Sequence, residues 1–489
     1  MIDLKFEQKE NIGFQYVLDA LQPNSPYGEE AIRKLKPFTP TEKPELLRQL
    51  NNVHRVMDGE ALCQNDLNRM LRVFMCAKNI RTTVVKCAEA ALNEIELFEV
   101  KRFLLQIEEM KPYFEAVQTA LHLEGVTLED TSEALEILDP EHNRIATFYI
   151  SDSYSPRLRA IRKEKKALED VMRRVKSGPE REEAQAKRVR VAADEEHEEG
   201  RIRGELSESL RPLIPAMLHN MQTIADLDLT VEKARLAKKY GGVMPEITES
   251  RVVLENMINP QIADLLEERG KHFTPVSISL EKGATVITGA NMGGKSVALK
   301  TIALNILLAH CGFFPFAGRA SVPLFDGMHI ISEDLESIDR GLSSFGGEIV
   351  RFNQVAQNMS EGFAFILLDE FARGTNPDEG AAIVQAVTSW LDTKNAVTVL
   401  ATHYDNVAQL GSAHYQVIGL KDLDVEALRN EIANSHGDVG VELIARHMNY
   451  GLYRVEEKQD CPRDALNICR LLGMREDILA MVENNYENR

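Results

Sequence analysis

The 489-residue sequence is short of the residues that mark several classes of protein. It has one tryptophan, six cysteines and an aromatic content of 6%. No two cysteines form a C-x-x-C pair, and their spacing fits neither a zinc site nor a disulfide framework. No apolar run is long enough to cross a bilayer, and the charged N-terminal stretch MIDLKFEQKENIGF lacks the apolar core of a signal peptide. We therefore expect a cytoplasmic protein with reduced, mostly buried thiols.

Positive charge is also scarce, with 57 basic residues against 76 acidic ones and a net charge of −19. A chain whose main task is to grip phosphate backbones usually carries a basic excess. A local basic patch can still bind DNA, so the acidic balance weighs against nucleic-acid binding without excluding it. The hydrophobic share of 44% is that of a globular protein, and the length suits two or three domains.

The first half of the sequence predicts helices almost throughout. Glycine and proline are sparse between residues 41 and 144, where leucine, alanine, glutamate and lysine dominate. The proline-containing segments 23–27 and 37–40 are predicted breaks between helices. We assign residues 1–150 to a helical core domain.

The segment 154–203 is highly charged and carries a narrow apolar seam. Ile161, Leu168 and Val175 recur every seven residues, which predicts a long helix that forms one arm of an antiparallel pair. The SGP sequence at 177–179 is the expected break. The basic run from Arg157 to Lys166 is either a solvated helix face or a set of phosphate contacts. Residues 151–245 are assigned to these arms, a reduced clamp and the return to the core.

From about residue 276 short β-rich runs alternate with helical stretches. The runs are ATVIT at 284–288, FAFILL at 363–368 and AVTVLA at 396–401. This alternation predicts an α/β domain built on a largely parallel sheet, which we place at 246–430. The tail from about residue 438 is predicted to return to short helices, and 431–489 is assigned to a C-terminal helical element.

The segment GANMGGKS at 289–296 fits G-x-x-x-x-G-K-[ST] in full, between a predicted strand and a predicted helix. Its glycines let backbone N–H groups and the helix N-terminus face phosphates. Lys295 is expected to reach the β- and γ-phosphates of ATP, and the Ser296 hydroxyl to hold Mg²⁺. The alternative is a chance glycine turn, against which the flanking strand and helix argue.

Two further predicted strands end in chemically active residues. Asp369 ends one of them and is expected in the Mg²⁺ shell, while Glu370 is expected to orient or deprotonate the attacking water. An ordinary acidic turn is the alternative. His403 follows the second strand and is a candidate γ-phosphate sensor, with a structural histidine as the alternative.

The segment LSSFGGE at 342–348 lies between these motifs and ahead of a predicted helix. A serine at a helix N-terminus with glycines beside it makes an anion-binding site. One chain has no need of it, because the P-loop already holds the phosphates. We therefore expect Ser343 to cap the γ-phosphate bound by a second protomer, with a plain N-cap as the alternative.

Together these motifs resemble those of the MutS family, within the ABC class of ATPases. TGANMGGKS at 288–296 is similar to the family's TGPNMGGKS, SSFGGE at 343–348 to STFxxE, LLDEFARGT at 367–375 to LxDExGRGT, and ATHY at 401–404 to ATHY. The resemblance implies a P-loop ATPase domain preceded by an all-α lever domain with a short helical arm pair. It implies ATP and Mg²⁺ as cofactors and a homodimer with composite sites. The expected nucleotide contacts of the loop are Gly289, Asn291, Gly293 and Gly294, with Asn291 carried over from the family alone.

The resemblance extends beyond the ATPase motifs, with departures. LDLTVEKARLA at 227–237 resembles the return of the helical core, and Asn449-Tyr450 with ALNICRLLG at 465–473 resembles the C-terminal helical element through which family members dimerise. No phenylalanine is followed two residues later by glutamate, so the Phe-x-Glu of the mismatch-reading domain is missing. Ala290 and Gly346 replace a proline and a methionine of the family pattern. A short form without mismatch recognition of the usual kind is therefore expected.

Two functions from different classes remain open. An ATP-driven clamp on mismatched or branched DNA is the family default, and the basic run at 157–166 offers phosphate contacts. An ATP-driven protein remodeller is the alternative, because short MutS-like ATPases of this layout resemble reactivating partners of adenosylcobalamin-dependent aminomutases. The acidic balance and the missing base reader suit a protein client. A chromosome-organising ABC-class ATPase would need a much longer coiled coil.

Overall fold

The computed structural model describes residues 2, 4–289, 294–332, 344–359, 362–404, 406–419, 449–456, 469–470 and 473–487. It divides into two compact units that are both discontinuous in sequence. The helical unit comprises Gln22–Leu35 and Arg55–Glu232, and the α/β unit comprises Met1–Leu21, Lys36–His54 and Lys233–Arg489. The four domains assigned from the sequence, at 1–150, 151–245, 246–430 and 431–489, remain predictions.

Helices make up the described elements of the helical unit, as the composition of the first half predicts. They are α3 (Pro26–Arg33), η2 (Glu60–Leu62), α5 (Gln64–Met75), α6 (Arg81–Cys87), α7 (Glu94–Leu121), α8 (Ser132–Leu138), α9 (Pro156–Arg174), α10 (Pro179–Leu210), η3 (Arg211–Leu213) and parts of α4 (Lys43–Gly59) and α11 (Ile214–Tyr240). Helix α7 begins at a capping box formed by Asn93 and Glu96 and packs against α5, α6 and α8. The prediction of a mainly helical first half is confirmed.

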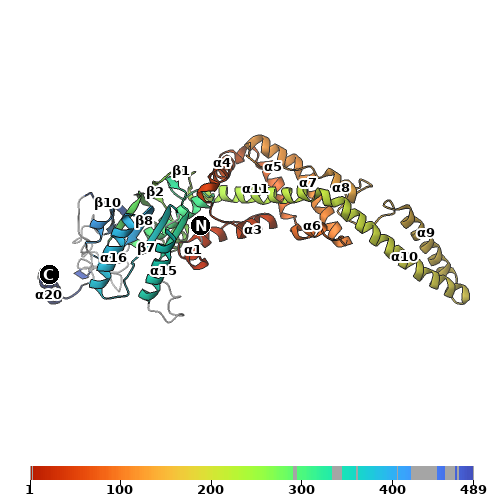
Figure 1. Cartoon of the computed structure of the whole chain (residues 1–489). Coiled ribbons are helices and arrows are strands. Elements are labelled where there is room, and N and C mark those ends of the chain that lie inside the picture. Colours follow the sequence, from red (N-terminus) through yellow and green to blue (C-terminus); the bar gives the residue numbers. More distant parts are fainter. Residues whose placement is uncertain are drawn as a thin grey trace. The chain divides into compact units, whose positions relative to one another are not determined.

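Helices α9 and α10 form the antiparallel pair that the seven-residue spacing predicts, and the chain turns between them at residues 175–178 (Figure 1). Ile161 and Leu168 of α9 are half-buried, and so is Val175, which the sequence placed in the same helix but which begins the turn after α9. Facing them, buried positions on α10 also recur every seven residues: Ala184, Val191 and Glu198. The arms therefore share one narrow seam, in which one position is a carboxylate.

The α/β unit holds two sheets and the helices around them. Its elements are α1 (Phe6–Asn11), α2 (Phe14–Asp19), η1 (Pro40–Glu42), β1 (Glu246–Thr248), β2 (Val252–Met257), α12 (Pro260–Glu268), β3 (Val276–Leu280), β4 (Gly283–Thr288), α13 (Lys295–His310), β5 (Arg319–Pro323), β6 (Gly327–Ile331), α15 (Ser344–Asn358), β7 (Ala364–Asp369), α16 (Pro377–Asp392), β8 (Ala396–Ala401), η5 (Ala408–Leu410), β9 (Ala413–Gly419), β10 (Asn449–Arg454) and α20 (Glu476–Glu487).

The larger sheet has six strands in the order β10-β9-β4-β8-β7-β6. All neighbouring pairs are parallel except β10 with β9, so the predicted largely parallel sheet is confirmed. Val286, Ile366 and Leu400 pack into one core cluster with residues of α15 and α16. The alternate residues Phe365 and Leu367 are buried as well, so side chains cover both faces, as parallel sheets require.

The smaller sheet, in the order β1-β5-β2-β3, was not foreseen from the sequence. Its strands β1 and β2 precede residue 276, where the β-rich pattern was expected to begin. The expected return to helices in the tail was also wrong at 449–454. Asn449 and Tyr450, assigned to a C-terminal helical element, lie in β10, which pairs with β9. That pairing depends on a partner strand, and local sequence does not display it.

None of the helices in the described ranges has the length and apolar content needed to cross a bilayer. The cysteines that the structure describes are unpaired, and Cys63, Cys87 and Cys311 are buried.

Candidate active site

Three neighbouring strands of the larger sheet bring the predicted motifs to one edge. Gly289 follows β4, Asp369 ends β7, and His403 lies two residues after β8, which runs between them. Backbone hydrogen bonds fix these ends, because Glu370 N donates to Ala401 O at 3.1 Å in the segment after β7. Carboxyl ends of parallel strands are where α/β sheets place ligand sites. The motifs separated in sequence therefore meet in space.

Lys295 is the first residue of α13, and its side chain is only 2% exposed. Its Nζ donates to the carbonyl of Gly289 at 2.8 Å and lies 3.5 Å from Glu370 Oε1. A buried ammonium group is costly unless it is paired. The Lys295 ammonium group thus lies between the carbonyl of Gly289, which follows β4, and the carboxylate of Glu370, which follows β7.

The Ser296 hydroxyl donates to Asp369 Oδ1 at 3.1 Å. Burial raises the pKa of the Asp369 carboxyl, and the nearby Glu370 acts in the same direction, while the Ser296 hydrogen bond opposes the rise. Two hard oxygen donors this close fit the first shell of Mg²⁺. Across the described ranges no group of three histidine, cysteine or acidic side chains is placed to hold a metal ion.

The segment after β7 has an unusual backbone. Glu370 and Ala372 have φ of 49° and 61°, in the left-handed region that non-glycine residues avoid. The segment is held by Glu348 Oε2, which accepts from Ala372 N at 2.8 Å, and by the Tyr404 hydroxyl, which donates to Ala372 O at 3.0 Å. Arg373 Nη1 donates to Glu370 Oε2 at 2.8 Å. Strain fixed by surrounding contacts in this way is typical of functional sites.

A cavity of about 350 Å³ opens beside this cluster. One part of its lining is polar and comes from Lys295, Ser296 and Glu370. The rest is mostly apolar: Ile262, Leu266, Phe273, Val276 and Tyr450. Gly294 borders it with a φ of 79°, and a Cβ there would lie 2.6 Å from the Tyr450 ring. Glycine at 294 therefore lets β10 close on the start of α13.

The sequence did not reveal the apolar lining or the role of Glu348. Ile262 and Leu266 lie on a short amphipathic helix whose pattern is that of any surface helix. Tyr450 reaches the cavity only through the pairing of β10 with β9. Glu348 is the last residue of the SSFGGE motif, but its hydrogen bond with Ala372 N depends on the backbone conformation after β7. Phe273 and Val276, apolar residues shortly before β4, are the part of this lining whose place in the sequence could have suggested it.

The remaining predicted site residues divide into two groups. Asn291, Gly293 and Ser343 lie outside the described residues. His403 is half-buried, and its ring lies 4.4 Å from that of Tyr404 between centroids. The role assigned to each site residue remains a prediction.

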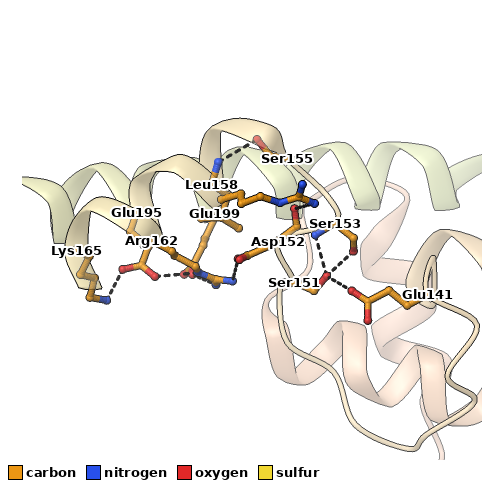
Figure 2. A network of polar contacts seen from close by, with 11 residues as sticks. Glu141, Ser151, Asp152, Ser153, Ser155, Leu158, Arg162, Lys165, Glu195 and Glu199 are labelled. Carbon is orange, nitrogen blue, oxygen red and sulfur yellow. Dashed lines mark hydrogen bonds and ion pairs between the residues drawn. The ribbon is translucent and has the colours of Figure 1, made fainter. Parts of the chain in front are cut away.

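The basic run on α9 has its own carboxylate partners (Figure 2). Arg162 donates to Asp152 at 2.8 Å, to Glu195 at 3.0 Å and to Glu199 at 2.7 Å, and Lys165 pairs with Glu195 as well. Glu195 and Glu199 belong to α10. The acidic run of one arm therefore neutralises the central part of the basic run of the other.

Glu198 continues this network in the seam, where the residue is fully buried. It accepts hydrogen bonds from Ser155 Oγ at 2.7 Å and from Arg201 Nη2 at 2.7 Å, and Arg157 lies 3.7 Å away. Ser155 also accepts from Leu158 N as the N-cap of α9. The hydrogen bonds from Arg201 and Ser155 lower the pKa of Glu198 to about 2. The seam carboxylate thus fastens α10 to the start of α9.

The fold and the clustered residues define a class: an α/β domain with a lysine, a serine and two carboxylates at the carboxyl edge of a parallel sheet, in one chain with a helical unit. A family model described as MutS domain V matches residues 285–471. An Endonuclease MutS2 of Symbiobacterium thermophilum is 33% identical over 244 residues, 49% of this chain and 30% of that protein. A DNA mismatch repair protein MutS of Thermus aquaticus is 29% identical over 347 residues, 69% of this chain and 41% of that protein. Over residues 285–471, where the family model matches, the chain is therefore similar to proteins of the MutS family.

The match to an Endonuclease MutS2 of Streptococcus equi subsp. zooepidemicus is similar, at 32% identity over 46% of this chain and 28% of that protein. The chain thus spans less than half the length of the curated relatives it matches.

Proposed function

We propose that this chain binds Mg²⁺–ATP in the cavity beside α13 and hydrolyses it. One observation carries the proposal: the Ser296–Asp369 and Lys295–Glu370 contacts lie at the polar side of a cavity whose other walls are apolar. A nucleotide has the same division into a charged triphosphate and a flat, largely apolar base. The base would lie among Ile262, Leu266, Phe273 and Tyr450.

Each polar residue then has a role that its position supports. Lys295 binds the β- and γ-phosphates, where its buried ammonium group acts with little screening. Ser296 and Asp369 hold Mg²⁺, which supplies charge neutralisation at the phosphates. Glu370 orients the attacking water and accepts its proton, and His403 contacts the γ-phosphate from the next strand end.

The active form proposed here is a homodimer with two composite sites. Ser343 of one protomer would reach the γ-phosphate bound by the other, so ATP ties the two chains and hydrolysis loosens them. Two features support this role of Ser343. The segment 343–348 resembles a family motif, and α15 begins at Ser344, the residue directly after Ser343. ATP binding in this scheme is coupled to association, and each stabilises the other.

The proposal is tested with Glu370→Ala, which should bind ATP and hydrolyse it very slowly. Size-exclusion chromatography with light scattering should then show a long-lived ATP-bound dimer, and steady-state phosphate release should fall by about 100-fold or more. Glu379→Ala removes an exposed carboxylate from the first turn of α16 and serves as the matched control. Wild-type turnover in the Glu370 variant would move the catalytic base elsewhere.

The first candidate client is mismatched or branched DNA. Support comes from the relatives, one named as a DNA mismatch repair protein and others as endonucleases. On this chain the exposed cations of α9 without a carboxylate partner in the described structure, such as Lys163 and Lys166, could meet phosphates.

The second candidate client is a protein, such as an adenosylcobalamin-dependent aminomutase. The observation that favours it is the pairing of Arg162 and Lys165 with the carboxylates of α10, because cations neutralised within the arms contribute little to phosphate binding. The arms would then act as levers on the protein client.

Binding of the Glu370→Ala protein with ATP to labelled four-way-junction and mismatched DNA across a salt series separates the two clients. Tight binding that weakens steeply with salt supports the DNA clamp, and the double variant Lys163→Ala/Lys166→Ala should then reduce the salt slope by about 2. Absence of binding even at low salt supports the protein client, to be captured by pull-down with the same trapped variant.

A further inference from the structure

Helix α12 forms one wall of the cavity and presents two different faces. Ile262 and Leu266, four residues apart, line the cavity. Asp264 lies midway between them, about 200° around the helix from each at 100° per residue. Its carboxylate therefore points away from the cavity, on the back of the wall.

Two tyrosine hydroxyls converge on that carboxylate. Tyr16 of α2 donates to Asp264 Oδ2 at 2.6 Å, and Tyr240, the last residue of α11, donates to the same oxygen at 2.9 Å. The hydrogen bond to Asp264 is the main cause that raises the pKa of Tyr16, and burial followed by the same carboxylate raises the pKa of Tyr240 to about 12. Both hydroxyls are therefore protonated donors at neutral pH. These charge-assisted bonds are stronger than neutral ones.

The start of α12 is tied to the same part of the chain. Asn259, the fully buried N-cap residue of α12, donates from Nδ2 to the carbonyl of Ile12 at 3.0 Å. Asn305 of α13 donates to the carbonyl of Ile258 at 3.1 Å. The wall is thus fixed at its N-terminus by Asn259 and on its back by Asp264, and residues 12–16 contribute to both.

We infer that Tyr16, Asp264 and Tyr240 form a positioning cluster, which holds the α12 wall at the distance that the base of the bound nucleotide requires. This inference rests on the proposed ATP site and adds a further set of residues to it. None of the three cluster residues is among the side chains that line the cavity. The cluster acts on the affinity for the base through Ile262 and Leu266, and leaves the hydrolytic step unchanged.

The test compares ATP with a ligand that has no base. Asp264→Asn keeps the shape of the side chain and removes its charge, so one or both hydroxyl bonds weaken. We expect the Kd for a non-hydrolysable ATP analogue and the KM for ATP to rise about tenfold, the product of about threefold for each of the two hydroxyl bonds. The Kd for inorganic tripolyphosphate and kcat should stay within about twofold, because the polar side of the cavity is unchanged.

Tyr16→Phe and Tyr240→Phe each remove one bond and should raise the Kd for the ATP analogue by about threefold. They also keep the inference testable if Asp264→Asn does not fold. Asp392→Asn is the matched control for loss of a carboxylate, since Asp392 accepts from Ala284 N and Ser412 N away from α12. Tyr154→Phe is the control for loss of a tyrosine bond, to the carbonyl of Ile137.

The outcomes separate the inference from the proposed function. A wild-type chain that binds neither ATP nor its analogue overturns the proposed function before any variant is compared. If wild type binds and the three cluster variants bind equally well, the positioning role is wrong. Equal losses for ATP and tripolyphosphate also overturn it, because they mean a general disturbance of the site.

Discussion

Two carboxylates, Asp369 in the α/β unit and Glu198 in the helical unit, show opposite electrostatics. Glu198 is fully buried and Asp369 is half-buried, and both accept a hydrogen bond from a serine hydroxyl. The pKa of Asp369 is raised because burial dominates and Glu370 lies nearby. The pKa of Glu198 is lowered to about 2 because Arg201 and Ser155 bind its charged form. The arm carboxylate is satisfied within the chain, whereas the site carboxylate gains when a cation arrives.

The cations of the two regions differ in the same way. Arg162 has three carboxylate partners, which neutralise its charge within the arms. Its side chain is 27% exposed, so solvent screens these ion pairs. Lys295 is 2% exposed beside a cavity, and its ammonium group lies near the Gly289 carbonyl and the Glu370 carboxylate. A basic residue can bind a ligand when its charged group borders a cavity. The number of basic residues in a stretch of sequence does not show whether this is so.

The largest effect expected from this difference is at Lys295. Lys295→Ala should weaken ATP binding by about 100-fold, the order expected when a charge-assisted contact worth about 3 kcal/mol is lost. Lys165→Ala removes a lysine of the arm network and should leave ATP affinity within about twofold. Isothermal titration calorimetry on both variants checks the pair. Normal affinity in the Lys295 variant would remove the assigned P-loop role.

Asp369→Asn should have two effects of opposite sign. Folding raises the pKa of Asp369, so the ionised carboxylate destabilises the folded chain at neutral pH. This destabilisation disappears as the pH falls through the raised pKa and the carboxylate becomes protonated. Replacing the charge should therefore raise the Tm of the metal-free protein at neutral pH by about 2 °C, the shift that roughly 1 kcal/mol produces in a domain of this size. ATP turnover should be lost, because Mg²⁺ loses a ligand.

Differential scanning calorimetry in the presence of a chelator, followed by a phosphate-release assay, checks both effects. A variant with a lowered Tm would mean that the Asp369 carboxylate stabilises the fold as Glu198 does, and the contrast between the two units would be lost.

Glu198 should show the opposite pH dependence and the smallest effect. Because folding lowers its pKa, ionised Glu198 contributes stability that is fully present above pH 4.5 and is lost as the pH falls toward about 2. Amide hydrogen exchange in α9 and α10 should accelerate through that window. Glu198→Gln should exchange about tenfold faster at neutral pH, the order of one lost charge-assisted hydrogen bond. Its arm exchange should also lose the acid-dependent step, and persistence of that step would assign it to another carboxylate.

Much of the fold could be predicted from the sequence because its signals are local. The strand, glycine-rich loop and helix around Lys295 follow one another along the chain. The seven-residue spacing of Ile161, Leu168 and Val175 likewise predicts the helical arm pair from neighbouring residues alone. The smaller sheet and β10 could not be predicted, since β pairing joins segments far apart. For the same reason Tyr450 was assigned to a helix.

The sequence by itself determined which residues we propose for phosphate chemistry, because the pattern of a phosphate loop is glycines, a lysine and a serine at fixed spacing. It also determined that the arms pair, because a seam needs a period. Only the tertiary structure decided which charges have partners, such as Arg162 with Glu195 on the other arm, 33 residues away. It also decided that Ile262, Phe273 and Tyr450 enclose one cavity. Both depend on distances between segments that are remote in sequence, and burial and pKa follow from those distances.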